Sequence, residues 1–278
     1  MDVNKRRIGV VGFGSLGQYL VEEIQARPEL ELAFVWNRSK ETMQQKLDER
    51  LILNDLSKFS ERNADIIVEV CHPKISEQYG ESFLENADYM VGSPSALANQ
   101  DTEDKLRNAA KHHGMYIPSG AFWGGEDIKK MADRGTLQAL KVTMTFHRDS
   151  LKLCGQLEDK NKNIKDNCTV LYDGPVRGLC PLAPNNVNTM AAASIAAHNL
   201  GFDNVQGCLK SEPNSLDFHI VEVEAWGPGN IEQGTAFHVR TVRKNPAKVG
   251  AVSGKATYAS FLSSLLGAHG KGPGVHLC

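Results

Sequence analysis

The chain has 278 residues, 41% of them hydrophobic and 23% charged, and a formal net charge of -2. This length allows two packed domains, and the near-neutral charge without a long basic run argues against a nucleic-acid partner. No apolar run reaches the roughly 20 residues of a membrane span, and residues 8–11 are too short an apolar stretch for a secretory signal. Six scattered cysteines without a C-x-x-C pair are typical of reduced thiols, so we expect a cytoplasmic protein.

The first 118 residues alternate short apolar runs with segments of helical periodicity. Strands are expected at residues 7–11, 32–36, 65–70, 89–92 and 115–117, and helices at residues 15–26, 75–84 and 102–112. Buried strands separated by amphipathic helices are typical of a parallel sheet that is covered on both faces. We therefore predict an α/β fold that begins with a Rossmann dinucleotide-binding domain over residues 1–118.

A G-x-G-x-x-G pattern lies between the first expected strand and the first expected helix. Gly12 permits a tight turn, Gly14 lets the backbone approach a pyrophosphate, and Gly17 allows the helix to pack closely on the strand. The backbone N–H groups of Ser15 and Leu16 then begin a helix whose N-terminus attracts phosphate. The pattern also occurs in ordinary strand–turn–helix units, but its position here predicts a dinucleotide site.

The end of the second expected strand indicates which dinucleotide binds. Proteins that select NAD carry an acidic residue there, about 20 residues beyond the glycines, whereas this chain has Asn37, Arg38 and Ser39, followed by Lys40. Arg38 can pair with a 2′-phosphate and stack on adenine, while Asn37 and Ser39 can donate hydrogen bonds. We favour NADP over NAD; the alternative is that Arg38 and Lys40 only solvate a loop.

The pattern changes after residue 118. Apolar and polar residues alternate over residues 139–148, 218–225 and 236–242. This period of two is typical of antiparallel strands with one solvated face, and it predicts an α+β domain with a mainly antiparallel sheet over residues 119–249. The other expectations for this half are an Ala-rich helix at residues 188–199, a polar mobile loop or hairpin tip at residues 158–167, a closing helix at residues 257–266 and a frayed tail at residues 269–278.

Three segments of this half resemble the L-aspartate dehydrogenase family. They are P-S-G-A-F-W-G-G-E-D from residue 118, A-P-N-N-V-N from residue 183, and F-H-I-V-E-V from residue 218. The order and spacing of these segments agree with the family over nearly the whole chain. The resemblance implies a homodimer in which the C-terminal helical segment, residues 250–268, returns to the Rossmann domain.

The same resemblance implies an activity and several site residues. Members oxidise L-aspartate, a small dicarboxylic amino acid, to iminoaspartate, which hydrolyses to oxaloacetate and ammonia, or they catalyse the reverse amination. His219 would be the catalytic residue, and Ala121, Asn186 and Asn188 would contact the cofactor. Two segments depart from the family pattern: residues 122–123 are Phe-Trp where members carry a small residue, and residues 251–257 replace an Asn-Pro-Lys-Thr-Ser segment.

The side chains and backbone groups of these segments have chemical properties that bear on catalysis independently of the resemblance. An imidazole titrates near pH 6.5, so His219 can exchange protons around neutrality, although a histidine at a strand head is more often structural. The backbone of Ser119 and Gly120, together with Ala121, leads into a helix near residue 125 and can form an anion-binding turn for substrate carboxylates. Further candidate cations, which the sequence does not rank, are Lys141, Arg148 and Lys255.

The remaining histidines point to ordinary structure. Pro73 follows His72 and indicates a turn, and His112 and His113 close a helix. No His/Cys/Asp cluster has the spacing of metal ligands, so no metal is expected.

Two alternatives to an aspartate dehydrogenase stay open: a dehydrogenase of this fold for another small amino, imino or oxo acid, and a non-catalytic NADP-binding redox sensor.

Overall fold

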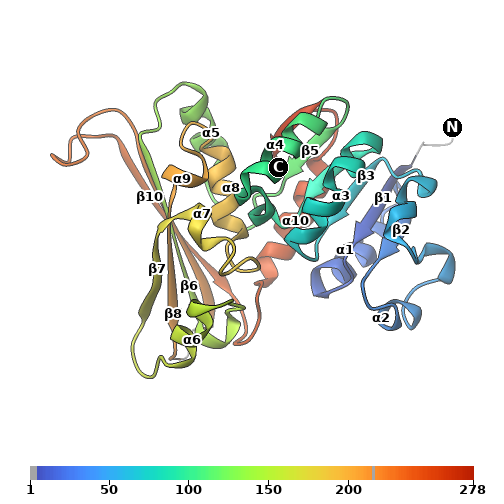
Figure 1. Ribbon diagram of the computed structural model, residues 1–278, viewed down its shortest axis with the longest axis horizontal. Helices are drawn as coiled ribbons and strands as arrows, with labels where there is room; N and C mark the ends of the chain where they lie inside the picture. Colours follow the sequence, from blue (N-terminus) through green and yellow to red (C-terminus); the bar gives the residue numbers. More distant parts are fainter. Residues whose placement is uncertain (1–4, 215–216) are drawn as a thin grey trace.

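The computed structural model describes residues 5–214 and 217–278. Figure 1 shows two α/β domains, each built on its own sheet. The first sheet contains β1 (Arg6–Val11), β2 (Leu30–Trp36), β3 (Ile66–Glu69), β4 (Asp88–Val91), β5 (Gly114–Ile117) and β11 (Gly274–Leu277). These strands lie in the order β11-β5-β4-β3-β1-β2, and every neighbouring pair is parallel. The expected Rossmann domain is therefore confirmed.

Helices cover both faces of this parallel sheet. On one face α1 (Ser15–Gln25) and α10 (Lys255–Gly267) share a core with β1, and on the other face α3 (Pro73–Asn86) and α4 (Gln100–Ala109) pack together. All four residues of β3 and of β5 are buried, as expected for strands covered on both sides. Burial of apolar side chains on both faces stabilises the sheet at about 25 cal/mol per Å² removed from water.

The tail, residues 269–278, was expected to be frayed, and this is wrong. Its strand β11 pairs in parallel with β5, where residue 274 lies opposite residue 114 and residue 277 opposite residue 117. Without β11, the N–H and C=O groups along the edge of β5 would be left unpaired. Gly270, Gly272 and Gly274 adopt positive φ angles, which the turns into this strand require. A four-residue strand is too short for periodicity to reveal it.

The second sheet is mixed and mainly antiparallel, as predicted. It contains β6 (Ala139–His147), β7 (Thr169–Pro175), β8 (Gln206–Glu212), β9 (Phe218–Trp226) and β10 (His238–Pro246). The order is β10-β9-β6-β8-β7; only β6 and β8 run parallel. Between this sheet and the Rossmann domain lie α5 (Gly125–Asp133), α7 (Val176–Leu179), α8 (Asn188–Ala196) and α9 (Gly201–Asn204) (Figure 1).

The polar stretch at residues 158–167 was expected to be a loop, and this is wrong for its first half. A short helix, α6 (Gln156–Lys162), begins there and buries Leu157. Acidic residues in its first turn and basic residues in its last turn interact favourably with the helix dipole. Lys162 also pairs with Glu158, one turn earlier, at 2.6 Å. The remaining short helices are α2 (Glu41–Gln44) and the 3-10 helices η1 (Glu49–Leu51), η2 (Leu56–Arg62), η3 (Pro94–Ala98) and η4 (Arg148–Ser150).

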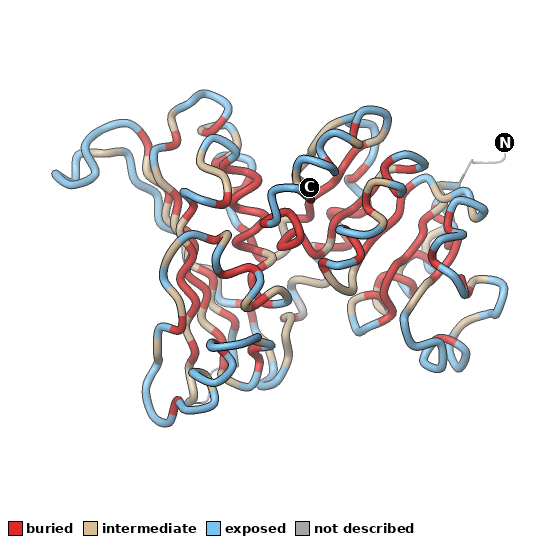
Figure 2. The backbone as a smooth tube through the Cα atoms, in the orientation of Figure 1, coloured by how far each residue is buried: buried red, intermediate tan, exposed pale blue. Residues whose placement is uncertain are grey.

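The two domains share one hydrophobic core. The cluster that includes Phe34 in the Rossmann domain continues to Val223 in the second sheet. Figure 2 shows buried backbone in the inner strands of both sheets and in α8, whose residues 189–196 are all buried. The segment after β4 packs on α8, so the carboxyl edge of the parallel sheet faces the second domain. No helix among the described residues is long and apolar enough to span a membrane.

Candidate functional site

The glycine pattern forms a turn in which the three glycines serve different purposes. A Cβ atom on Gly12 would lie 2.8 Å from the Cβ of Cys71, and one on Gly17 would lie 2.1 Å from the carbonyl oxygen of Gly12. Both positions therefore need glycine for the fold itself. A Cβ on Gly14 would meet no atom within 4 Å, and no side chain caps the N-terminus of α1 beside it. The turn thus leaves open space in front of unpaired helix N–H groups, which fits a pyrophosphate.

A cavity of about 460 Å³ lies beside Gly14 and is lined by Asn37 and Arg38. Asn37 is engaged within the protein: its Oδ1 accepts from Phe13 N at 3.2 Å, and its Nδ2 donates to the carbonyl of Ser39 at 2.9 Å. Asn37 therefore fixes the glycine turn to the loop after β2. Ser39 contributes that carbonyl to the loop and does not line the cavity.

Arg38 gives this cavity its positive charge. Its side chain is exposed and forms no hydrogen bond or ion pair within the described chain, and Lys74 lines the same cavity. The pKa of His72 lies below its ordinary value because of burial and, in addition, because of the charges of Lys74 and Arg38. A cavity with two unneutralised cations suits a phosphate group.

A second cavity, of about 110 Å³, lies where the two domains meet. It is lined by seven of the residues that the sequence analysis assigned to cofactor binding, substrate binding or catalysis. They are Leu16, Ser119, Gly120, Ala121, Asn186, Asn188 and His219. Gly14 lines the first cavity and Leu16 the second, so the first turn of α1, which begins at Ser15, lies between them. This arrangement suits an elongated ligand whose phosphates rest on the helix N-terminus.

His219 lines the second cavity and has a buried imidazole nitrogen without a hydrogen-bond partner among the described residues. The residue is 6% exposed, and its ring packs 4.7 Å from that of Phe146. Burial lowers the pKa of His219, and a hydrogen bond to the backbone of Ala251 partly opposes this effect. Nε2 is buried and has no hydrogen-bond partner in the described chain. In the tautomer with the proton on Nδ1, Nε2 keeps a lone pair that can accept an incoming proton.

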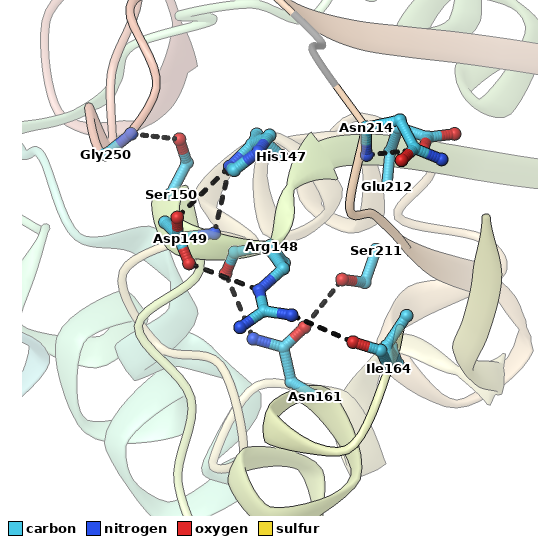
Figure 3. A network of polar contacts seen from close by, with 10 residues as sticks. All are labelled: His147, Arg148, Asp149, Ser150, Asn161, Ile164, Ser211, Glu212, Asn214 and Gly250. Atoms are coloured by element: carbon cyan, nitrogen blue, oxygen red, sulfur yellow. Dashed lines mark hydrogen bonds and ion pairs between the residues drawn. The ribbon is translucent and has the colours of Figure 1, made fainter. Parts of the chain in front are cut away.

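Asn186 is engaged on both sides of its carboxamide. Its Nδ2 donates to the carbonyl of Ser150 at 3.0 Å, and its Oδ1 accepts from Lys152 N at 2.7 Å. Figure 3 shows that Ser150 Oγ in turn accepts from Gly250 N, at 3.0 Å. Asn186 thus fixes the segment that anchors the loop carrying Ala251, and it has little capacity left for a cofactor. Asn188 accepts a longer bond, 3.4 Å, from Ser95 N.

The turn after β5 is held by distant parts of the chain. Ser119 donates twice to the backbone oxygen of Cys278, from N at 2.8 Å and from Oγ at 2.9 Å. The carbonyl of Gly120 accepts from Ser260 Oγ at 2.9 Å and from Arg243 Nη1 at 3.2 Å. Both donors of Ser119 are therefore used, and the expected anion-binding turn is reduced to the N–H groups of Gly120 and Ala121.

Two of the candidate cations named from the sequence, Lys141 and Arg148, do not line either cavity. Lys141 pairs with Asp173 at 2.9 Å, and Arg148 donates to the carbonyl of Ile164 at 2.9 Å (Figure 3). The side chain of Lys255 lies outside the described residues. His113 Nδ1 donates to the carbonyl of Leu84 at 2.8 Å, which is a structural contact. Within the described ranges, no three His, Cys, Asp or Glu side chains are grouped as metal ligands.

Glu69, at the end of β3, is a buried carboxylate that the sequence analysis missed. It accepts hydrogen bonds from the backbone N–H groups of Cys71 at 2.7 Å, His72 at 2.8 Å and Ser93 at 2.9 Å. Burial raises the pKa of Glu69, while these donors act in the opposite direction. The residue fixes the loops after β3 and β4, one beside each cavity. A glutamate within an apolar strand was the available signal, because buried charges are rare without partners.

Comparison with known proteins identifies the family. Residues 12–118 match the homoserine dehydrogenase NAD-binding domain, and residues 127–264 match the aspartate dehydrogenase C-terminal domain. The chain is 55% identical to an aspartate dehydrogenase domain-containing protein of Xenopus tropicalis, over 100% of this chain and 99% of the relative. It is 30% identical to an L-aspartate dehydrogenase of Methanocaldococcus jannaschii, over 69% of this chain and 74% of that protein.

The solved structures agree with this result at the level of the fold. An aspartate dehydrogenase from Thermotoga maritima superposes with a TM-score of 0.68 at 19% identity, over 96% of this chain and 97% of that one. The Rossmann domain is accordingly an NAD(P)-binding dehydrogenase domain. The resemblance found in the sequence is confirmed, and the chain belongs to the aspartate dehydrogenase family.

Proposed function

We propose that this protein is an NADP-preferring dehydrogenase that oxidises L-aspartate to iminoaspartate, or catalyses the reverse reaction. The observation that carries the proposal is the unpaired Nε2 of buried His219 at a cavity that also borders the N-terminus of α1. The names of the archaeal relatives, which are L-aspartate dehydrogenases, support the choice of substrate. The expected homodimer and cytoplasmic location stay predictions.

The residues at the two cavities fit a dinucleotide. The open space at Gly14 and the uncapped helix N-terminus would receive the pyrophosphate, and Leu16 and Ala121 would border the nicotinamide half. When bound, the nicotinamide supplies a site that accepts or donates a hydride. Ala121, Asn188 and the fixed turn of Gly120 would limit water around that half of the ligand.

His219 would handle the proton in this reaction. Because its pKa lies below the ordinary value, the ring is neutral at neutral pH, and Nε2 can take a proton from the substrate amine or from water that attacks the imine carbon. The N–H groups of Gly120 and Ala121 would hold one substrate carboxylate.

The preference for NADP rests on Arg38. An exposed guanidinium with no partner among the described residues, in the cavity next to Gly14 and near Lys74, can form paired hydrogen bonds with a 2′-phosphate dianion. No acidic residue from the loop after β2 lines this cavity to hold a ribose diol instead. NAD remains the alternative cofactor.

The proposal is tested by following NADPH formation and consumption with L-aspartate, oxaloacetate plus ammonia, and a panel of other amino and oxo acids. His219→Ala should lower kcat by roughly 10²–10⁴-fold, which is the usual contribution of a positioned acid–base group, while NADPH affinity changes little. His219→Asn should be nearly as slow. His198→Ala is the matched control, because His198 is exposed and pairs with Asp133 away from the cavities.

The outcomes separate the alternatives. Turnover of another small acid, but not of aspartate, would support a dehydrogenase of this fold with a different substrate. Tight NADPH binding without turnover of any acid in the panel would support the redox sensor. A His219→Ala variant with normal kcat would show that the histidine is structural.

A further inference from the structure

Arg243 lies on the same side of the second sheet as His219. In the antiparallel pairing of β9 and β10, Asn245 is opposite His219 and Arg243 is opposite Val221. Residues directly opposite each other, and residues two apart on one strand, share a face of the sheet. His219, Val221 and Asn245 all line the cavity between the domains, so the side chain of Arg243 starts from the cavity face of β10.

The guanidinium of Arg243 has almost no partners there. Its hydrogen bond within the described chain goes to the carbonyl of Gly120, at 3.2 Å, although a guanidinium has five N–H donors. No described carboxylate pairs with it, and burial alone lowers its pKa. Arg240, three residues earlier on the opposite face, pairs in contrast with Glu222 at 2.6 Å. A half-buried cation without a counter-charge is costly unless an anion arrives to neutralise it.

The contact with Gly120 also directs Arg243 to the substrate turn. Gly120 has the backbone N–H expected to hold a carboxylate, and it lines the cavity. Its carbonyl keeps a second donor, Ser260 Oγ at 2.9 Å, so this carbonyl stays bonded when the guanidinium moves toward a ligand. Arg243 is not itself among the residues that line the cavity, but its guanidinium lies against Gly120, which does line it, and its remaining donors have no partner among the described residues.

We propose that Arg243 binds one carboxylate of the substrate and makes the enzyme selective for dicarboxylic amino acids. This inference rests on the proposed function, because it names the residue that selects the substrate class in the same cavity. Planar guanidinium and carboxylate groups can form two parallel hydrogen bonds, which a monocarboxylic substrate would lack at this position. The N–H groups of Gly120 and Ala121 would then hold the other carboxylate.

The test compares L-aspartate with L-alanine, which lacks only the second carboxylate. Arg243→Gln keeps a donor for Gly120 but removes the charge. It should lower kcat/KM for L-aspartate by about 10–100-fold, since hydrogen bonds to charged groups contribute about 1.5–3 kcal/mol. The much lower kcat/KM for L-alanine should not change, so the ratio between the two substrates should fall. Arg240→Gln is the control on the same strand and should leave both values unaltered.

A binding experiment keeps this inference separate from the proposed function. Succinate, a dicarboxylate that cannot be oxidised at an amine, is titrated calorimetrically into the protein with bound NADP+. Wild type should bind it, Arg243→Gln should bind it about 10–100-fold more weakly, and NADP+ affinity should be equal in both. If succinate behaves in this way but aspartate is not turned over, the proposed function is wrong, while the carboxylate contact of Arg243 stands.

Several results would overturn the inference. Equal losses for aspartate and alanine, or a parallel loss of NADP+ affinity, would mean that Arg243 only supports the Gly120 turn. Equal succinate binding by wild type and variant, or none by wild type, would also refute it. Should Arg243→Gln fail to fold, Arg243→Lys keeps the charge without the planar fork; it should retain selectivity for aspartate with a raised KM, and an unchanged KM would count against a paired carboxylate contact.

Discussion

Substitutions in the glycine turn of Gly12, Gly14 and Gly17 should separate an effect on dinucleotide binding from an effect on stability. Gly14 has φ of -72° and ψ of -171°, an extended conformation that valine adopts readily, and a Cβ there meets nothing within 4 Å. Gly14→Val should therefore fold with a free energy of unfolding within about 0.5 kcal/mol of wild type. Its methyl groups would fill the space in which the pyrophosphate meets the helix N-terminus.

The loss of affinity can be estimated from the contacts that this space permits. Two charge-assisted hydrogen bonds from helix N–H groups to phosphate contribute about 2 kcal/mol each, so their loss weakens NADPH binding by about a thousandfold. Gly17→Ala is the matched comparison. Its Cβ would lie 2.1 Å from the backbone oxygen of Gly12, so the helix or the strand must move by more than an ångström. Such overpacking typically costs about 1–3 kcal/mol.

Thermal unfolding with and without NADPH distinguishes the two variants. Without ligand, Gly14→Val should have the same Tm as the wild-type protein. Its Tm should not rise when NADPH is added, because a ligand stabilises only the state that binds it. Gly17→Ala should have a lower Tm even without ligand. The reasoning is refuted if Gly14→Val keeps the full increase with NADPH, or if it unfolds as early as Gly17→Ala.

Two further predictions concern Arg38 and His219. Arg38→Ala should weaken NADPH binding about 10–100-fold more than NADH binding in fluorescence titrations, since it removes a charged partner of the 2′-phosphate; equal losses would contradict the assignment. Burial lowers the pKa of His219 below 6.5, so as the pH falls the unfolded chain binds a proton at this residue before the folded chain does. Protonation therefore favours the unfolded state, and His219 should make the free energy of unfolding decline below about pH 6.5. Denaturant titrations should show a shallower decline for His219→Asn, and an unchanged slope would argue against a lowered pKa.

The Rossmann domain could be predicted because its signals are local. The spacing of Gly12, Gly14 and Gly17 falls between a buried strand and an amphipathic helix, and each of these features is contained within a few residues. The second domain was harder. β7 carries a register shift between Val170 and Tyr172, and its burial pattern does not alternate regularly, so the period of two that revealed β6 and β9 is absent.

The site residues divide in the same way. His219 and the turn of Gly120 became candidates through family segments, which are continuous in sequence. Arg243 and Glu69 were missed because their importance depends on tertiary contacts: the register that places one strand opposite another, and the loops that converge on a buried carboxylate. Sequence also cannot show that Asn186 uses its carboxamide on the backbone of Ser150 and Lys152.

The turn after β5 links these observations, because three remote segments meet on it. β11 leads to Cys278, which accepts both bonds of Ser119, while α10 and β10 supply Ser260 and Arg243 to the carbonyl of Gly120. The Rossmann domain provides the open glycine turn, and the second domain provides His219 and Arg243. The geometry of the proposed substrate turn therefore depends on the contact between the domains, and neither domain alone contains all the groups that the proposed reaction needs.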